Sequence, residues 1–122
     1  MFLSEEPMAL SRLAQEFAAE VAQHDWSDAP YRADRAGHQN ADDRPGRTAP
    51  QLTPEQTDVV RENVMWVAAQ VLGFSDPNFP LYEFAEACGV STITRSGRKD
   101  GGIEAGIRKR SDGSYQHPGV RE

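Results

Sequence analysis

The chain has a single cysteine among its 122 residues, Cys88, so an internal disulfide bond is excluded. Small domains of secreted proteins commonly rely on several disulfides, because their hydrophobic cores are too small to stabilise them alone. We therefore expect a protein of a reducing compartment, and the cytoplasm is the simplest choice. The thiol of Cys88 is interpreted as a small apolar core residue rather than a nucleophile.

Long apolar runs are also missing. Hydrophobic residues make up 38% of the chain, and no run approaches the about 18 consecutive apolar residues that a membrane span requires. The opening stretch, MFLSEEPMALSRLAQ, has two early glutamates and no basic segment, which is unlike a secretory signal peptide. We expect one domain over residues 1–122 that has no membrane partner.

Sequence motifs typical of catalysis are absent as well. The chain contains no glycine-rich phosphate loop, no nucleophile elbow and no cysteine–histidine signature. Paired acids occur at Glu5–Glu6 and Asp42–Asp43, but both pairs lie in polar segments where nothing indicates a raised pKa. The sequence therefore predicts a protein that is not an enzyme, with no catalytic residues, no cofactor and no cofactor-binding residues.

Metal-binding motifs are missing in the same way. Histidines and aspartates could in principle be combined into a site, but none of them has the short spacing of a CxxC or of an i, i+4 histidine pair. The sequence predicts no metal site. The groups considered are His24, His38, His117, Asp25, Asp28 and Asp34.

What the chain does have is an uneven distribution of charge. Residues 1–90 carry 6 basic and 15 acidic side chains, a net charge of −9, whereas residues 91–122 carry 7 basic and 4 acidic, a net charge of +3. Only the C-terminal part can present the basic face that phosphate binding requires. The acidic part fits a basic protein partner.

Apolar periodicity predicts a mainly α protein, a small helical domain with two longer helices and one short one. The first helix is expected over about residues 5–23, with Ser4 as its N-cap. The second is expected to begin in a capping box between Thr53 and Gln56. It is expected to end at Gly73, as a left-handed residue just beyond the helix.

The third helix is short and is expected from about residue 80 to residue 88, with Gly89 terminating it. Apolar stripes on the three helices are expected to meet in one core. Val67 is expected to be central, so its replacement by aspartate is predicted to unfold the protein. The expected core residues are Leu10, Leu13, Phe17, Val21, Val60, Val64, Trp66, Val67, Val71, Leu72, Leu81, Phe84 and Cys88.

Two segments have no helical period. Residues 25–51 are rich in proline, glycine and charge and are interpreted as a long polar loop or linker, with residues 35–51 as a mobile connection. Residues 90–122 are interpreted as a basic β-hairpin and tail. Its strands are expected at residues 90–95, 103–110 and 114–117, with a tight hairpin turn at Asp112-Gly113.

A partial helix-turn-helix overlaps the third helix. The residues that match the pattern of its first helix and turn are Phe84, Ala85, Gly89 and Val90. The second helix, however, would have to bury Arg95 and Arg98, and Gly97 would interrupt it. We therefore favour an ordinary glycine-capped helix followed by a strand, with DNA binding as an alternative. Phosphate contacts could come from Arg95, Arg98, Lys99, Arg108, Lys109 and Arg110.

The stretch HDWSDAPYRADRAGH combines aromatic residues, proline and charge. Tryptophan, tyrosine and arginine are the residue types enriched at binding hot spots. Trp26 and Tyr31 could instead close over the central helix as a lid, and the two roles can coexist. The partner-binding candidates are Trp26, Tyr31, Arg32 and Arg35.

Two stretches, APYRADRAGH and LTPEQTDVVRENVMWVAAQVLGFSDPNFPLYEFAEACGV, together with very few lysines, resemble the small, uncharacterised proteins carried by phages of high-GC actinobacteria. The resemblance implies binding to a host or phage macromolecule in the host cytoplasm, and it transfers no site residues. The leading hypothesis is therefore a non-enzymatic, protein-binding accessory protein. The alternatives are a small DNA-binding regulator and a virion structural protein, and self-association is compatible with all three.

Overall fold

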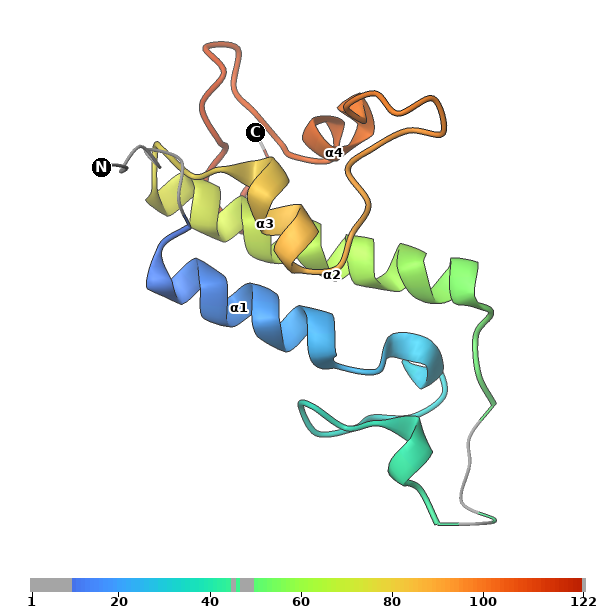
Figure 1. The fold of residues 1–122 in the computed structure, drawn as a ribbon. Coiled ribbons are helices and arrows are strands. Elements are labelled where there is room, and N and C mark those ends of the chain that lie inside the picture. Colours follow the sequence, from blue (N-terminus) through green and yellow to red (C-terminus); the bar gives the residue numbers. More distant parts are fainter. Residues whose placement is uncertain (1–9, 45, 47–49, 122) are drawn as a thin grey trace, which may run out of the picture.

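The computed structural model describes residues 10–44, 46 and 50–121, and it confirms that the protein is mainly helical (Figure 1). None of the described helices is both long enough and apolar enough to cross a bilayer. The α-helices of the described part are α1 (Arg12–Gln23), α2 (Pro54–Ser75), α3 (Leu81–Ala87) and α4 (Gly101–Ala105). Two 3-10 helices lie between α1 and α2, η1 (Trp26–Asp28) and η2 (Asn40–Asp42).

Helix α1 begins at Ser11, which is later than the sequence predicted. The Ser11 hydroxyl accepts a hydrogen bond from the backbone N–H of Ala14 at 3.1 Å, so it caps the first turn. Ser4, the expected cap, lies outside the described residues. Both serines precede a helix-forming stretch, so the local signal alone did not distinguish them.

Helix α2 begins as predicted and ends later. Thr53 and Gln56 form the expected capping box, with hydrogen bonds of 3.1 Å and 2.9 Å between side chain and backbone. Gly73, however, lies inside the helix, which continues to Ser75. A Cβ at Gly73 would lie 2.1 Å from Cε2 of Tyr115, so this glycine lets an aromatic ring pack directly on the helix backbone.

Helix α3 confirms the predicted glycine stop. Gly89 has a φ of +88°, in the left-handed region, and the N–H of Val90 donates to the carbonyl of Ala85 at 2.9 Å. Cys88, at the end of the helix, is fully buried, as expected. Burial raises the pKa of its thiol to about 12, so the thiol is protonated at neutral pH.

The core overlaps only partly with the prediction. The predicted residues that are buried as expected are Val21, Leu72, Leu81, Phe84 and Cys88. On α1 the other buried residues are Ala14 and Ala18, and on α2 they include Met65 and Ala69. The expected stripe was partly wrong because both helices are apolar on more than one face, and the local pattern does not decide which face is covered. The predicted core residues that the structure leaves exposed are Leu13, Phe17, Val67 and Val71; Leu10, Val64 and Trp66 pack partly buried against the core, and Val60 is half-buried.

The predicted C-terminal strands are wrong. The first part of residues 103–110 belongs to α4, whose first turn is capped by Asp100 through the backbone N–H of Gly102 at 2.9 Å. Within residues 90–121, β pairing is limited to two isolated antiparallel bridges, Ile93–Lys99 and Lys109–Tyr115. A turn does form at Asp112-Gly113, but the expected β-hairpin is not seen.

A buried glutamine on α2 anchors this segment. The side chain of Gln70 accepts from the N–H of Arg108 at 2.9 Å and donates to the carbonyls of Arg108 and Gln116 at 3.0 and 3.1 Å. Backbone bonds from Gln116 to Arg108 and from Arg110 to Ser114 still link the two sides of the turn, so Gln70 ties a very short pairing to the helix. Residues 90–100 also contain no helix, so the second helix of a helix-turn-helix is missing, as the sequence indicated.

Candidate functional site

A groove with a volume of about 680 Å³ runs between α1 and α2. The two helices lie side by side and run in opposite directions (Figure 1), so the start of α1 faces the end of α2. Its floor and walls are apolar, and most of the residues that form them had been predicted as core. The lining includes Leu13 and Phe17 from α1 and Val64, Val67 and Val71 from α2, which were predicted as core, and Ala68, which was not.

The apolar side chains of this groove are exposed to solvent. Val67 is 73% exposed and Leu13 is 56% exposed, while Val71 and Phe17 are 50% and 45% exposed. Isolated exposed apolar residues are common on protein surfaces, but a contiguous set of them on two neighbouring helices marks an interaction site. The groove therefore has the chemistry of a surface that is covered when a partner binds.

The charged groups beside the groove are acidic. Glu20 of α1 and Asp34 of the following loop line it, and neither lysine nor arginine does so among the described residues. The acidic rim agrees with the negative charge of residues 1–90. An occupant with basic residues beside its apolar face would be attracted to this site.

Trp26 lines the groove just beyond the C-terminal end of α1. Its indole Nε1–H donates to the carbonyl of Val21 at 2.8 Å, and its ring contacts His24 edge-on with centroids 4.3 Å apart. Trp26 is half-buried and lines the groove, so it is held in position at the end of α1. The other aromatic candidate of this stretch, Tyr31, is exposed and is not among the residues that line the groove.

The loop after α1 is built around Arg32, which the sequence had suggested as a partner contact. Its Nε lies 2.9 Å from Asp28 Oδ2 and 3.1 Å from Asp34 Oδ1, and its Nη2 lies 2.6 Å from Asp43 Oδ2. His38 Nε2 is 2.7 Å from the same Nη2. Arg32 is therefore a structural centre of the loop, whereas Arg35 is exposed.

A second set of hydrogen bonds ties η1 to η2. Asp25 accepts from the backbone N–H of Ser27 at 3.0 Å and of Asn40 at 2.8 Å, and Asn40 Nδ2 donates to Asp28 Oδ2 at 3.1 Å. Burial alone would raise the pKa of Asp25, but the hydrogen bonds from Ser27 and Asn40 outweigh it and lower the pKa. The sequence predicted little to hold the part of this loop after Arg35, but His38, Asn40 and Asp43 make these contacts.

Three of the six basic candidates for nucleic-acid binding make the following contacts within the molecule. Arg108 donates to the carbonyl of Val120 at 3.2 Å, Lys109 pairs with Glu104 at 2.5 Å, and the ammonium of Lys99 lies 4.2 Å from the centre of the Tyr82 ring. The remaining three, Arg95, Arg98 and Arg110, are exposed.

The structure brings only part of this set together. Lys99, Lys109 and Arg110 line one cavity of about 570 Å³, which also contains Glu104 and Tyr115. Arg95 and Arg98 lie on the separate turn around Gly97, and Arg108 lines a different cavity. The six residues therefore do not form one continuous basic face.

No family model, curated protein or solved structure matches the chain. The groove and the Arg32 cluster are consequently interpreted from their own geometry. The sequence suggested Arg32 as a partner contact and did not predict the cluster around it, because its members meet only in the tertiary fold. The apolar groove residues were recognised from the sequence, but as core.

Proposed function

We propose that the protein is a non-enzymatic binding protein whose α1–α2 groove receives an amphipathic helix of a protein partner. The exposed apolar stripe formed by Leu13, Phe17, Val67 and Val71 carries the proposal. Helix-in-groove recognition uses such stripes, with apolar anchors of the bound helix spaced by three and four residues. The resemblance to phage proteins agrees with an accessory role toward a host or phage macromolecule in the host cytoplasm.

The dimensions and charge of the groove indicate the length and charge of the helix that would bind there. Helix α1 has 12 residues and therefore spans about 18 Å, which suits a bound helix of roughly three turns. The acidic side chains of Glu20 and Asp34 favour lysine or arginine beside the partner's apolar face. A second copy of this chain is a poorer occupant, because a symmetric contact would place these acidic rims against each other.

DNA binding is less well supported by the arrangement of basic residues. Arg108 and Lys109 are engaged within the molecule, and the exposed arginines lie on separate turns. A duplex would also meet the negative charge of residues 1–90. We therefore place protein binding first.

The proposal is tested with two synthetic helical peptides that share one apolar face and differ only in flanking lysines or glutamates. Binding is measured by fluorescence anisotropy on the native protein and on the Val67→Asp variant. The matched control is Val59→Asp, since Val59 also lies on α2, is 55% exposed and does not line the groove. We expect the native protein to bind the lysine peptide more tightly than the glutamate peptide. The affinity for the lysine peptide should fall in Val67→Asp and stay unchanged in Val59→Asp.

The same three proteins are then used to capture partners from a host lysate. A partner that is retained by the native protein and by Val59→Asp, but lost with Val67→Asp, would support the groove. Equal retention by all three would contradict it. The DNA-binding alternative is tested by titrating a labelled DNA duplex at two salt concentrations. Binding that falls steeply with salt would favour a small DNA-binding regulator instead.

A further inference from the structure

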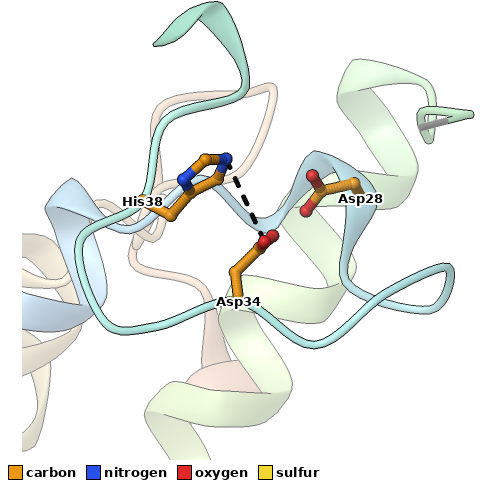
Figure 2. A group of neighbouring side chains, drawn as sticks. All are labelled: Asp28, Asp34 and His38. Atoms are coloured by element: carbon orange, nitrogen blue, oxygen red, sulfur yellow. Dashed lines mark ion pairs between the residues drawn. The ribbon is translucent and has the colours of Figure 1, made fainter. Parts of the chain in front are cut away.

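Three of the side chains that were considered as metal ligands from the sequence, and rejected because of their spacing, converge in the loop after α1. Asp28, at the end of η1, Asp34 and His38 each offer a ligand atom, and these atoms all lie within 4.8 Å of one another. Figure 2 shows the two carboxylates and the imidazole directed toward a common point. Ligands of one Zn²⁺ ion sit about 2.0–2.2 Å from it, so each of these atoms would have to move inward by up to about 0.7 Å to bind one ion.

An unpartnered buried oxygen sets this cluster apart from an ordinary acidic surface. Asp28 is only 1% exposed, and its Oδ1 has no hydrogen-bond partner in the described part of the chain. The other oxygen, Oδ2, takes the hydrogen bonds from Arg32 and Asn40. A buried carboxylate oxygen without a donor is costly, and a metal ion is one of the few groups that can satisfy it.

The charge of the cluster is also incompletely balanced. Asp28, Asp34 and Asp43 are largely buried, with side-chain exposures of 1%, 12% and 8%, and Arg32 supplies one positive charge among them. Three carboxylates and one guanidinium leave a net charge of −2, as long as His38 is neutral. A divalent cation would bring the sum to zero, which removes the cost of excess charge in a poorly solvated site.

The contacts of His38 also favour a bound cation. Its Nε2 lies 2.7 Å from Arg32 Nη2, which can only donate, and 3.0 Å from Asp43 Oδ1, which can only accept when ionised. One tautomer cannot satisfy both contacts. A bound cation would resolve this conflict, because the Nε2 lone pair would then face the ion.

We propose that Asp28, Asp34 and His38 form a binding site for a divalent transition-metal ion, Zn²⁺ or Mn²⁺. A mixture of carboxylate oxygens and one imidazole nitrogen suits these ions, whereas Ca²⁺ and Mg²⁺ favour oxygen ligands throughout. On binding, the ion takes the place of the Arg32 guanidinium beside Asp28, Asp34 and His38, and Arg32 keeps its pairing with Asp43. This site does not depend on the proposed function of the groove.

The test is a Zn²⁺ titration of the chelator-treated full-length protein by isothermal calorimetry. We expect one ion per chain, with the affinity lowered at least about tenfold in His38→Ala and in Asp34→Asn. His117→Ala is the matched control, because this exposed histidine lies outside the cluster and reports incidental binding of Zn²⁺ to imidazole. Equal affinity of the native protein and His38→Ala, or no saturable binding up to millimolar Zn²⁺, would overturn the site.

A second measurement remains decisive even if a variant fails to fold. Substoichiometric Mn²⁺ is added to the native protein, and paramagnetic broadening of its amide NMR signals is followed residue by residue. We expect the signals of residues 28, 34 and 38 to broaden first, while those of the turn at residues 94–98 persist. Broadening that is centred elsewhere, or that is uniform over the acidic surface, would overturn the proposal.

Discussion

The two apolar faces of α2 differ in how they are covered. Met65 and Ala69 are fully buried on one face, while Val67 and Val71 on the other are exposed along the groove. Hydropathy alone does not separate these faces, because both are apolar. The covered face belongs to the core that also contains Ala14 and Ala18 of α1 and Phe84 of α3. Side-chain size does not separate the faces either, because the large Met65 is buried and the smaller Val67 is exposed. The packing of α1 and α3 against α2 decides which face is buried and which is left for a partner.

The largest expected effect comes from placing the same charge on each face. Ala69→Asp would bury an unpaired carboxylate, at a cost comparable to the about 5–15 kcal/mol that stabilises a domain, so we expect it to unfold. Val67→Asp is expected to change the free energy of unfolding by no more than about 0.5 kcal/mol, because position 67 is exposed. This reverses the expectation from the sequence. Urea denaturation measures the free energy of unfolding of both variants. An unfolded Val67→Asp would refute the claim that this face of α2 is open to solvent.

A smaller effect is expected where glycine permits close packing on α2. Gly73→Ala would drive a Cβ into the ring of Tyr115, so we expect a loss of about 1–3 kcal/mol, the usual cost of overpacking. Gly101→Ala is the control, since nothing lies within 4 Å of a Cβ there and α4 is helical at that position. Thermal unfolding compares the two, and equal midpoints would show that Tyr115 does not pack on α2.

A further expected effect is a dependence on alkaline pH that arises from the covered side. Burial raises the pKa of Cys88 from 9.0 to about 12, and that of Tyr115 from 10.0 to about 12. In the unfolded chain both groups lose their protons at lower pH, so the native state holds more protons between pH 9 and 12 and stability falls as pH rises. Urea denaturation at several alkaline pH values measures the slope, which should be reduced in Cys88→Ala.

Local signals were the part of the fold that the sequence predicted well. The capping box at Thr53 and the left-handed stop at Gly89 depend on a few neighbouring residues, and both were confirmed. The strands beyond residue 90 were wrong because their pairing is limited to single bridges, and the segment around Arg108 is held on α2 by Gln70, which is distant in the chain. A side chain that acts over such a separation leaves no local pattern.

The candidate sites were predicted less well than the helices, for the same physical reason. Leu13 and Val67 were recognised as apolar and periodic, but their exposure is set by how closely α1 and α2 approach. Arg32 was read as a binding residue, yet its partners Asp28 and Asp43 meet it only once η1 and η2 have formed. Composition therefore identified the residue types, and the tertiary fold determined their roles.

The openness of the groove is tested most directly by thiol labelling of a Val67→Cys variant. The native thiol, Cys88, is buried and protonated, so a maleimide reagent should report position 67 alone. We predict labelling as fast as that of a free cysteine, slowed when the lysine-flanked helical peptide is added. Labelling as slow as that of Cys88 in the native protein, or a rate that the peptide does not change, would contradict an open groove that receives a partner's helix.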